Sequence, residues 1–163
     1  MTAAADSALL ESRARELARA PVTPPGDTIE VVTFRLSGET YGVESKYVLE
    51  VVRVTDLAQL PGAQPPVLGI TTWRGALLHV CDLRPILGLP STTLDDLTRL
   101  IVLGRDAPAF GVLAQAVHDL VAVPAHALRE PTEDVALRRE YLRGVTAQAV
   151  IVLSAAKLLA IEI

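Results

Sequence analysis

The sequence predicts a mainly β fold: two small five-stranded barrels related by an internal repeat, with short helices and one helix at the N-terminus. Short segments rich in Val, Leu and Ile alternate with turn residues along most of the chain. No series of long helices separates these segments, as it would in a parallel α/β sheet. Each copy of the repeat supplies about five strands, enough for one small closed barrel. In a chain of 163 residues, two such barrels would bury an apolar face against each other.

The N-terminal part is expected to be separate from the barrels. Residues 6–20 predict a short helix, because their apolar positions recur at steps of four and three. The Pro-rich residues 21–27 then end the helix and form a linker. We therefore divide the chain into a helix and linker at 1–27 and a main domain at 28–163, which we expect to consist of two interleaved barrel subdomains. The helix either docks on the main domain or acts as a docking or oligomerisation arm.

The main domain begins with a predicted hairpin. Residues 28–36 are rich in β-branched residues, and residues 40–43 return after a Ser-Gly-Glu turn. Residues 45–53 form either a short helix capped by Ser45 or a turn that leads into a strand. Residues 60–66 contain Pro and Gly and are expected to be a loop.

A second predicted hairpin pairs residues 67–73 with residues 76–83 across an Arg-Gly turn. Asp82 is expected to be the N-cap of a helix at 83–88, which ends at Gly88. The other expected elements are strands at 99–104, 109–114 and 117–124, a polar excursion or short helix at 132–140, two strands within 141–153, and a helix at 154–160 capped by Ser154.

The internal repeat is visible when two segments are aligned. YGVESKYVLEVVRV, residues 41–54, aligns without a gap on FGVLAQAVHDLVAV, residues 110–123, so that Tyr41 falls 69 residues before Phe110. A second block aligns GIT…LHVCDLRPIL with GVT…VIVLSAAKLL, with a two-residue gap at the Trp-Arg-Gly tip. Val-rich strands resemble each other by chance, but two blocks in the same order favour a true repeat.

Composition excludes several functional classes. The net charge of −4 and the small number of aromatic residues disfavour a barrel that binds nucleic acid, because such binding requires a basic face and stacking platforms. No apolar run approaches the roughly 20 residues that cross a bilayer, so direct membrane insertion is not expected. One cysteine and no recognisable signal peptide fit a cytoplasmic protein.

The sequence offers no set of residues for catalysis or metal binding. His79, His118 and His126 are not accompanied by HExxH, CxxC or clustered carboxylates. Cys81 is expected to be a buried small hydrophobe. No glycine-rich phosphate loop is present. We therefore expect no enzyme activity, cofactor, metal ion or small-molecule substrate.

The ordered motifs resemble the chemotaxis coupling protein family, which is called CheW-like. The resemblance spans about residues 29–160 and rests on VLGITTWRGALLHVCDLRPIL, YVLEVV, the Phe-Gly-Val strand and the closing YLRGV…VIVLSAAKLL. It implies two five-stranded SH3-like barrels packed side by side. It also implies a non-catalytic adaptor between the cytoplasmic tip of a chemoreceptor and the regulatory domain of a CheA-type histidine kinase.

The chain departs from the family pattern at several positions. Thr72 and Trp73 stand where the tip usually has Asn and Leu, and Ser154 stands where Asp is frequent. These departures leave open a parallel chemosensory pathway that governs pili, gliding or development.

The resemblance assigns partner contact to Val48, Glu50, Gly69 and Arg74, and it suggests an ion pair between Glu50 and Arg74. We expect the receptor helices to bind in a groove between the barrels, bordered by Val48, Glu50 and Arg74. We add Trp73, because Trp and Arg are enriched among residues that dominate interface energies and a short hairpin presents them at low ordering cost. The alternatives are that Trp73 folds back as a lid over a barrel end and that Arg74 is an idle surface charge.

Overall fold

The computed structural model describes residues 28–90, 93–131 and 139–163. The helix expected at 6–20 lies outside the described residues, as does most of the excursion expected at 132–140. The described part of the chain is mainly β, as predicted, with one short α-helix and a few short 3₁₀ turns. The strands are β1 Thr28–Leu36, β2 Glu39–Glu44, β3 Val48–Arg53, β4 Ala58–Gln59, β5 Val67–Trp73, β6 Ala76–Cys81, β7 Arg99–Gly104, β8 Pro108–Ala114, β9 Ala116–Pro124, β10 Leu142–Val145 and β11 Ile151–Leu153. The helical elements are η1 Ser45–Tyr47, η2 Leu94–Asp96, η3 Ala125–Ala127 and α2 Ala155–Leu159.

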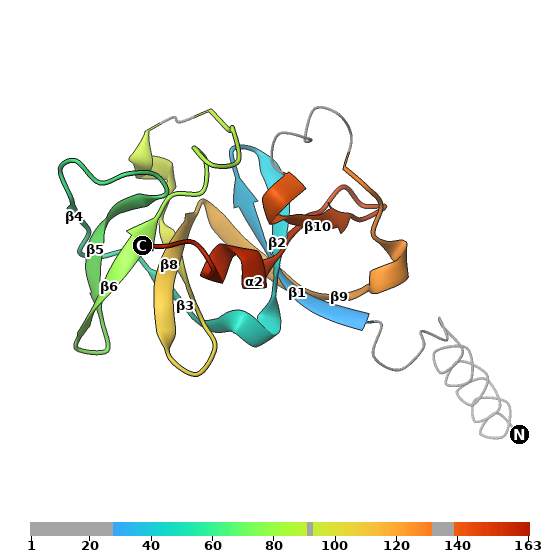
Figure 1. Ribbon diagram of the computed structural model, residues 1–163, viewed down its shortest axis with the longest axis horizontal. Helices are drawn as coiled ribbons and strands as arrows, with labels where there is room; N and C mark the ends of the chain where they lie inside the picture. Colours follow the sequence, from blue (N-terminus) through green and yellow to red (C-terminus); the bar gives the residue numbers. More distant parts are fainter. Residues whose placement is uncertain (1–27, 91–92, 132–138) are drawn as a thin grey trace, which may run out of the picture.

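The strands form two sheets that lie side by side (Figure 1). The five-stranded sheet has the order β10-β11-β2-β1-β9, and the six-stranded sheet has the order β3-β7-β8-β6-β5-β4. Both orders are linear, and the ladders of the described residues do not join the two outer strands of either sheet. The prediction of two sheet-based units is therefore confirmed, whereas closure of each unit into a five-stranded barrel is not.

The pairing pattern of the first sheet recurs in the second at the spacing that the sequence alignment predicts. In the hairpin of β1 and β2, Val32 pairs with Val43, and 69 residues later Ile101 of β7 pairs with Val112 of β8. The parallel ladders also correspond, since Val152 of β11 pairs with Gly42, and Val80 of β6 pairs with Gly111. The aligned residues therefore occupy equivalent places in the two sheets.

The third strand of each copy is exchanged between the sheets. β3 follows β2 in the chain but pairs with β7 of the other sheet, where Val51 lies opposite Ile101. β9 follows β8 but pairs with β1, where Leu120 lies opposite Val32. Backbone hydrogen bonds thus connect the two copies in both directions. The sequence analysis expected interleaved subdomains but did not say which strands are exchanged.

The main core lies where the two sheets meet. It contains Phe34 and Tyr41 of the five-stranded sheet, whose rings stack with centroids 6.0 Å apart, together with Leu103 and Phe110 of the six-stranded sheet. All four are at most 2% exposed. Leu158 of α2 belongs to the same cluster, and Figure 1 shows α2 crossing this seam. Burial of large apolar side chains here contributes most of the hydrophobic stabilisation, because their area is removed from water.

The prediction of a helix at 83–88 is wrong, because the chain makes only a single hydrogen-bonded turn there. Leu87 N donates to Leu83 O at 2.9 Å, and Gly88 then adopts a positive φ of 63°. A left-handed glycine ends a helix, and Pro90 follows it, so the chain cannot continue beyond one turn. Asp82 still acts like a cap, since its Oδ1 accepts from the backbone N–H of Arg84 at 3.0 Å. The helix predicted after Ser154 is confirmed as α2, and Ser154 Oγ accepts from Lys157 N.

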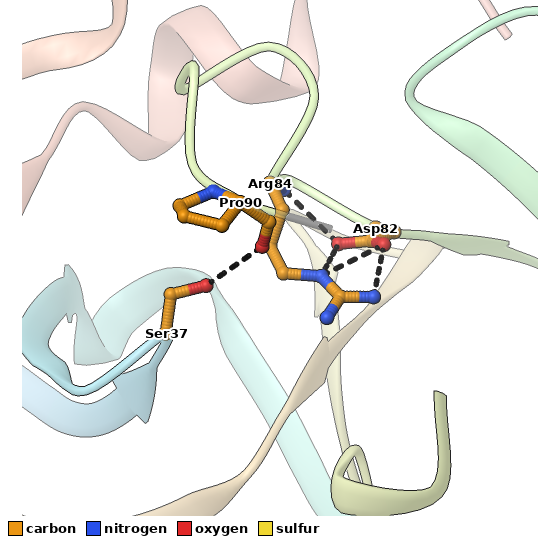
Figure 2. A network of polar contacts seen from close by, with 4 residues as sticks. All are labelled: Ser37, Asp82, Arg84 and Pro90. Atoms are coloured by element: carbon orange, nitrogen blue, oxygen red, sulfur yellow. Dashed lines mark hydrogen bonds and ion pairs between the residues drawn. The ribbon is translucent and has the colours of Figure 1, made fainter. Parts of the chain in front are cut away.

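A buried ion pair holds this turn in place (Figure 2). The Arg84 guanidinium donates through Nε and NH2 to the Asp82 carboxylate, and the shortest contact is 2.8 Å. Both side chains are less than a tenth exposed. Ser37, in the turn between β1 and β2, donates to the Pro90 carbonyl at 3.3 Å. The turn after β6 is thus fixed internally and also tied to the other sheet.

Replacing Arg84 with Met should destabilise the protein by about 3–5 kcal/mol, because the Asp82 carboxylate would stay buried without its partner. Denaturant unfolding measures this loss. The matched control is the double variant Asp82→Asn/Arg84→Met, in which the remaining group is neutral, and it should regain part of the stability. Equal stabilities of the single and double variants would contradict this account of the pair.

Candidate functional site

The hairpin of β5 and β6 ends in a two-residue turn formed by Arg74 and Gly75. Their φ angles are 48° and 78°, both in the left-handed region. Turns with two positive φ angles match the twist of the flanking strands, which is why short hairpins use them. Gly adopts this conformation freely, whereas Arg is an uncommon choice that places a long cationic side chain at the tip.

Three side chains meet beside this turn, and we call Glu50, Trp73 and Arg74 the tip cluster. Trp73 Nε1 donates to Glu50 Oε2 at 2.8 Å, and Arg74 NH2 lies 3.3 Å from the same oxygen. The Arg74 guanidinium carbon lies 4.5 Å from the centre of the Trp73 ring, within cation–π range. The predicted pair of Glu50 and Arg74 is therefore present, and Trp73 contacts both partners.

The tip cluster connects distant parts of the six-stranded sheet. Glu50 lies on β3, the outer strand at one side, whereas β5 is next to β4, the outer strand at the other side. Contact between them requires the sheet to curl. Trp73 is half-buried and packs against the main core. Arg74 pairs with Glu50, and two thirds of its side chain is exposed.

The other two predicted site residues lie away from the cluster contacts. Val48 begins β3, is half-buried on the main core and pairs with Leu103. Gly69 is buried in β5, where it pairs with Gln59 of the neighbouring strand β4. A Cβ at Gly69 would lie 2.2 Å from the carbonyl oxygen of Ala58. The close approach of β4 is thus a sufficient structural reason for glycine at this position.

Sequence reasoning missed a second group of cationic and aromatic side chains at the start of β3. The Tyr47 ring has Lys46 Nζ at 5.1 Å and Arg105, from the β7–β8 turn, at 5.7 Å from its centre. It also missed Glu44, which is 5% exposed and binds Arg143 of β10 at 2.6 Å. The contacts of Arg105 with Tyr47 and of Arg143 with Glu44 join residues far apart in the chain, so no local pattern indicated them.

The geometry offers no catalytic or metal centre among the residues that the structure describes. No three His, Cys, Asp or Glu side chains come together there. His79, His118 and His126 are exposed on β6, β9 and η3. Cys81 is fully buried, and this burial, assisted by the charge of Asp82, raises the pKa of its thiol to about 12. Such a thiol stays protonated near neutral pH and is a poor nucleophile.

Comparison with known proteins identifies the family. Residues 30–162 match the model of the CheW-like domain. The chain belongs to the CheW-like domain family. The chemotaxis protein CheW of Treponema pallidum is 27% identical over 135 residues, which cover 80% of this chain and 79% of that relative. Protein FrzA of Myxococcus xanthus is 33% identical over 116 residues, which cover 71% of this chain and 72% of that relative.

A solved CheW structure has the same fold. The scaffolding protein TtCheW of Thermoanaerobacter tengcongensis superimposes with a TM-score of 0.65 at 23% sequence identity, over 77% of this chain and 88% of that chain. Both sheets and the tip cluster lie within or next to the matched CheW-like region. In the part of the chain that the structure describes, none of the helices has the length and apolar character needed to cross a membrane.

Replacing Gly69 with Ala should destabilise this CheW-like domain by about 1–3 kcal/mol, because the new Cβ must displace the β4 backbone. Denaturant unfolding gives the change in free energy of unfolding. Thr72→Ala, at an exposed position of the same strand, should change it by less than about 0.5 kcal/mol. Unchanged stability of Gly69→Ala would return Gly69 to the set of candidate contact residues.

Cys81 should not react with Ellman's reagent in the native protein at pH 8, and it should react once guanidinium chloride unfolds the chain. Because the thiol ionises at a lower pH in the unfolded chain, its contribution to stability should fall as the pH rises from about 9 to about 12. Rapid labelling under native conditions would contradict the burial of Cys81.

Proposed function

We propose that this chain is a non-catalytic, cytoplasmic chemotaxis coupling protein that links the cytoplasmic tip of a chemoreceptor to the regulatory domain of a CheA-type histidine kinase. The observation that carries the proposal is the match of the CheW-like domain over residues 30–162. The matched relative from Treponema pallidum is named a chemotaxis protein, and the solved relative is described as a scaffolding protein.

The tip cluster and Val48 are the proposed partner-binding surface for the receptor. Arg74 is two thirds exposed and sits on a short hairpin, so a partner can reach it without reordering the chain. Val48 and Glu50 lie two positions apart on β3, the outer strand of the six-stranded sheet, and they would border a groove that accepts a receptor helix. Gly69 would act on this surface only through the placement of β4.

The kinase is proposed to bind through exposed strand ends and apolar side chains. Leu77, near the start of β6, is 75% exposed, and Leu120, in the middle of the outer strand β9, is 60% exposed. We propose further that the two sheets are the curled walls of SH3-like barrels, which would let the chain meet a barrel of similar shape in the kinase. Support comes from the tip cluster, which connects β3 and β5 across the six-stranded sheet.

A second candidate function is coupling in a non-flagellar chemosensory pathway. The match to FrzA, at 33% identity, allows it. Thr72 and Trp73 at the tip are the residues expected to alter partner choice in that case. The two candidates share the scaffold and differ only in which receptor and kinase they connect.

Replacing Arg74 with Ala should reduce receptor capture in a pull-down from native lysate at least about tenfold, because exposed Arg residues at the centre of an interface often contribute more than 1.4 kcal/mol. The matched control is Arg53→Ala, which removes an exposed arginine from β3. It should leave capture unchanged, and both variants should retain the melting temperature of the parent.

Mass spectrometry of the captured proteins decides the proposal itself. Recovery of both a chemoreceptor and a histidine kinase with the unmodified chain would support it. Recovery of neither a chemoreceptor nor a histidine kinase would count against the coupling function, independently of the results with the variants.

A further inference from the structure

The only tryptophan of the chain ends β5, next to the exposed turn of Arg74 and Gly75, yet its ring is half-buried. Its ring nitrogen donates to Glu50 Oε2 at 2.8 Å, and its face carries the Arg74 guanidinium at 4.5 Å. The same Glu50 oxygen lies 3.3 Å from Arg74. Each of the three side chains therefore contacts the other two, and Trp73 is the one anchored in the core.

An ion pair between Glu50 and Arg74 alone would not hold a fixed geometry. The two side chains are 37% and 66% exposed. Such exposed pairs contribute about 0–1 kcal/mol, because ordering two long side chains offsets the attraction between their charges. A hydrogen bond from an indole N–H to a carboxylate is stronger than one between neutral groups. Trp73 supplies that donor and fixes the acceptor to which Arg74 also binds.

The backbone supports the same interpretation. Arg74 has a φ of 48°, a conformation that costs a residue with a side chain about 1–2 kcal/mol and that Gly or Asn adopts more easily. Strained residues of this kind persist where the surrounding structure holds them, and they are frequent at binding sites. The guanidinium at this turn lies over the Trp73 ring, while two thirds of the Arg74 side chain stays exposed to solvent.

We infer that Trp73 is a positioning residue: its indole holds Glu50 and Arg74 in one binding-ready arrangement before a partner arrives. This inference rests on the proposed function, and it assigns Trp73 a different task from direct contact with the partner. The energetic advantage is preorganisation, since the ordering cost of Arg74 is met in the free protein instead of at binding.

A double-mutant cycle tests the inference with a purified cytoplasmic fragment of a chemoreceptor from the same organism as the probe. Trp73→Phe keeps an aromatic ring and removes the N–H, so affinity should fall about tenfold, and Trp73→Leu should reduce it further. In the Arg74→Ala background, Trp73→Phe should cause no additional loss, because a positioning residue acts through Arg74. An equal loss in both backgrounds would mean that Trp73 touches the partner directly and would overturn the inference.

The indole N–H resonance gives a readout that does not depend on the partner. The chain has one Trp, so this resonance is a single assignable signal. Glu50→Gln should move it upfield, because a hydrogen bond to a carboxylate becomes one to an amide, while the melting temperature stays constant. A resonance that does not move would overturn the inference. If Arg74→Ala binds the receptor fragment normally, the proposed receptor surface is wrong, and the indole result still decides whether Trp73 holds the cluster.

Discussion

The exchange of β3 and β9 between the two sheets is the constraint on which the rest of the structure depends. β3 finds its hydrogen-bond partners on β7, and β9 finds its partners on β1. A strand without a partner would leave its backbone groups unsatisfied, which is costly wherever they are shielded from water. Neither copy of the repeat therefore completes its sheet alone. The seam between the sheets, with Phe34, Tyr41, Leu103 and Phe110, forms because the exchange holds the sheets together.

The tip cluster is a consequence of this arrangement. Glu50 belongs to β3, and β3 lies on the six-stranded sheet only because β7 of the second copy pairs with it. Trp73 and Arg74 belong to the first copy and reach that sheet through the pairing of β6 with β8. The side chains of the tip cluster thus come from the first copy. Strands β7 and β8 of the second copy hold β3 and β6 in one sheet and so bring Glu50 close to Trp73 and Arg74.

Local patterns in the sequence predicted most of the strands, because alternation and turn residues are local properties. The same patterns failed at 83–88, where Gly88 and Pro90 stop the chain after one turn, and they missed β4, which has only two residues. The repeat predicted which residues are equivalent, and the ladders agree with it. The repeat could not predict which strands pair with each other, because an alignment of the two copies gives equivalent residues and contains no information on contacts between the copies. The hydrogen bond from Trp73 to Glu50 was also missed, because 23 residues separate the two and local patterns do not indicate such contacts.

The exchanged strands also bear on how such a chain could have arisen. In this protein the third strand of each copy pairs with the first strand of the other copy, so a single copy would have both a third strand and a first strand without these partners. Two identical molecules could satisfy both needs by lending each other that strand, as domain-swapped homodimers do. Fusion of two genes would then turn a symmetric dimer into a monomer without breaking a hydrogen bond. Released from symmetry, one copy could keep Leu113 in its interior while the other acquired Glu44 at the equivalent place.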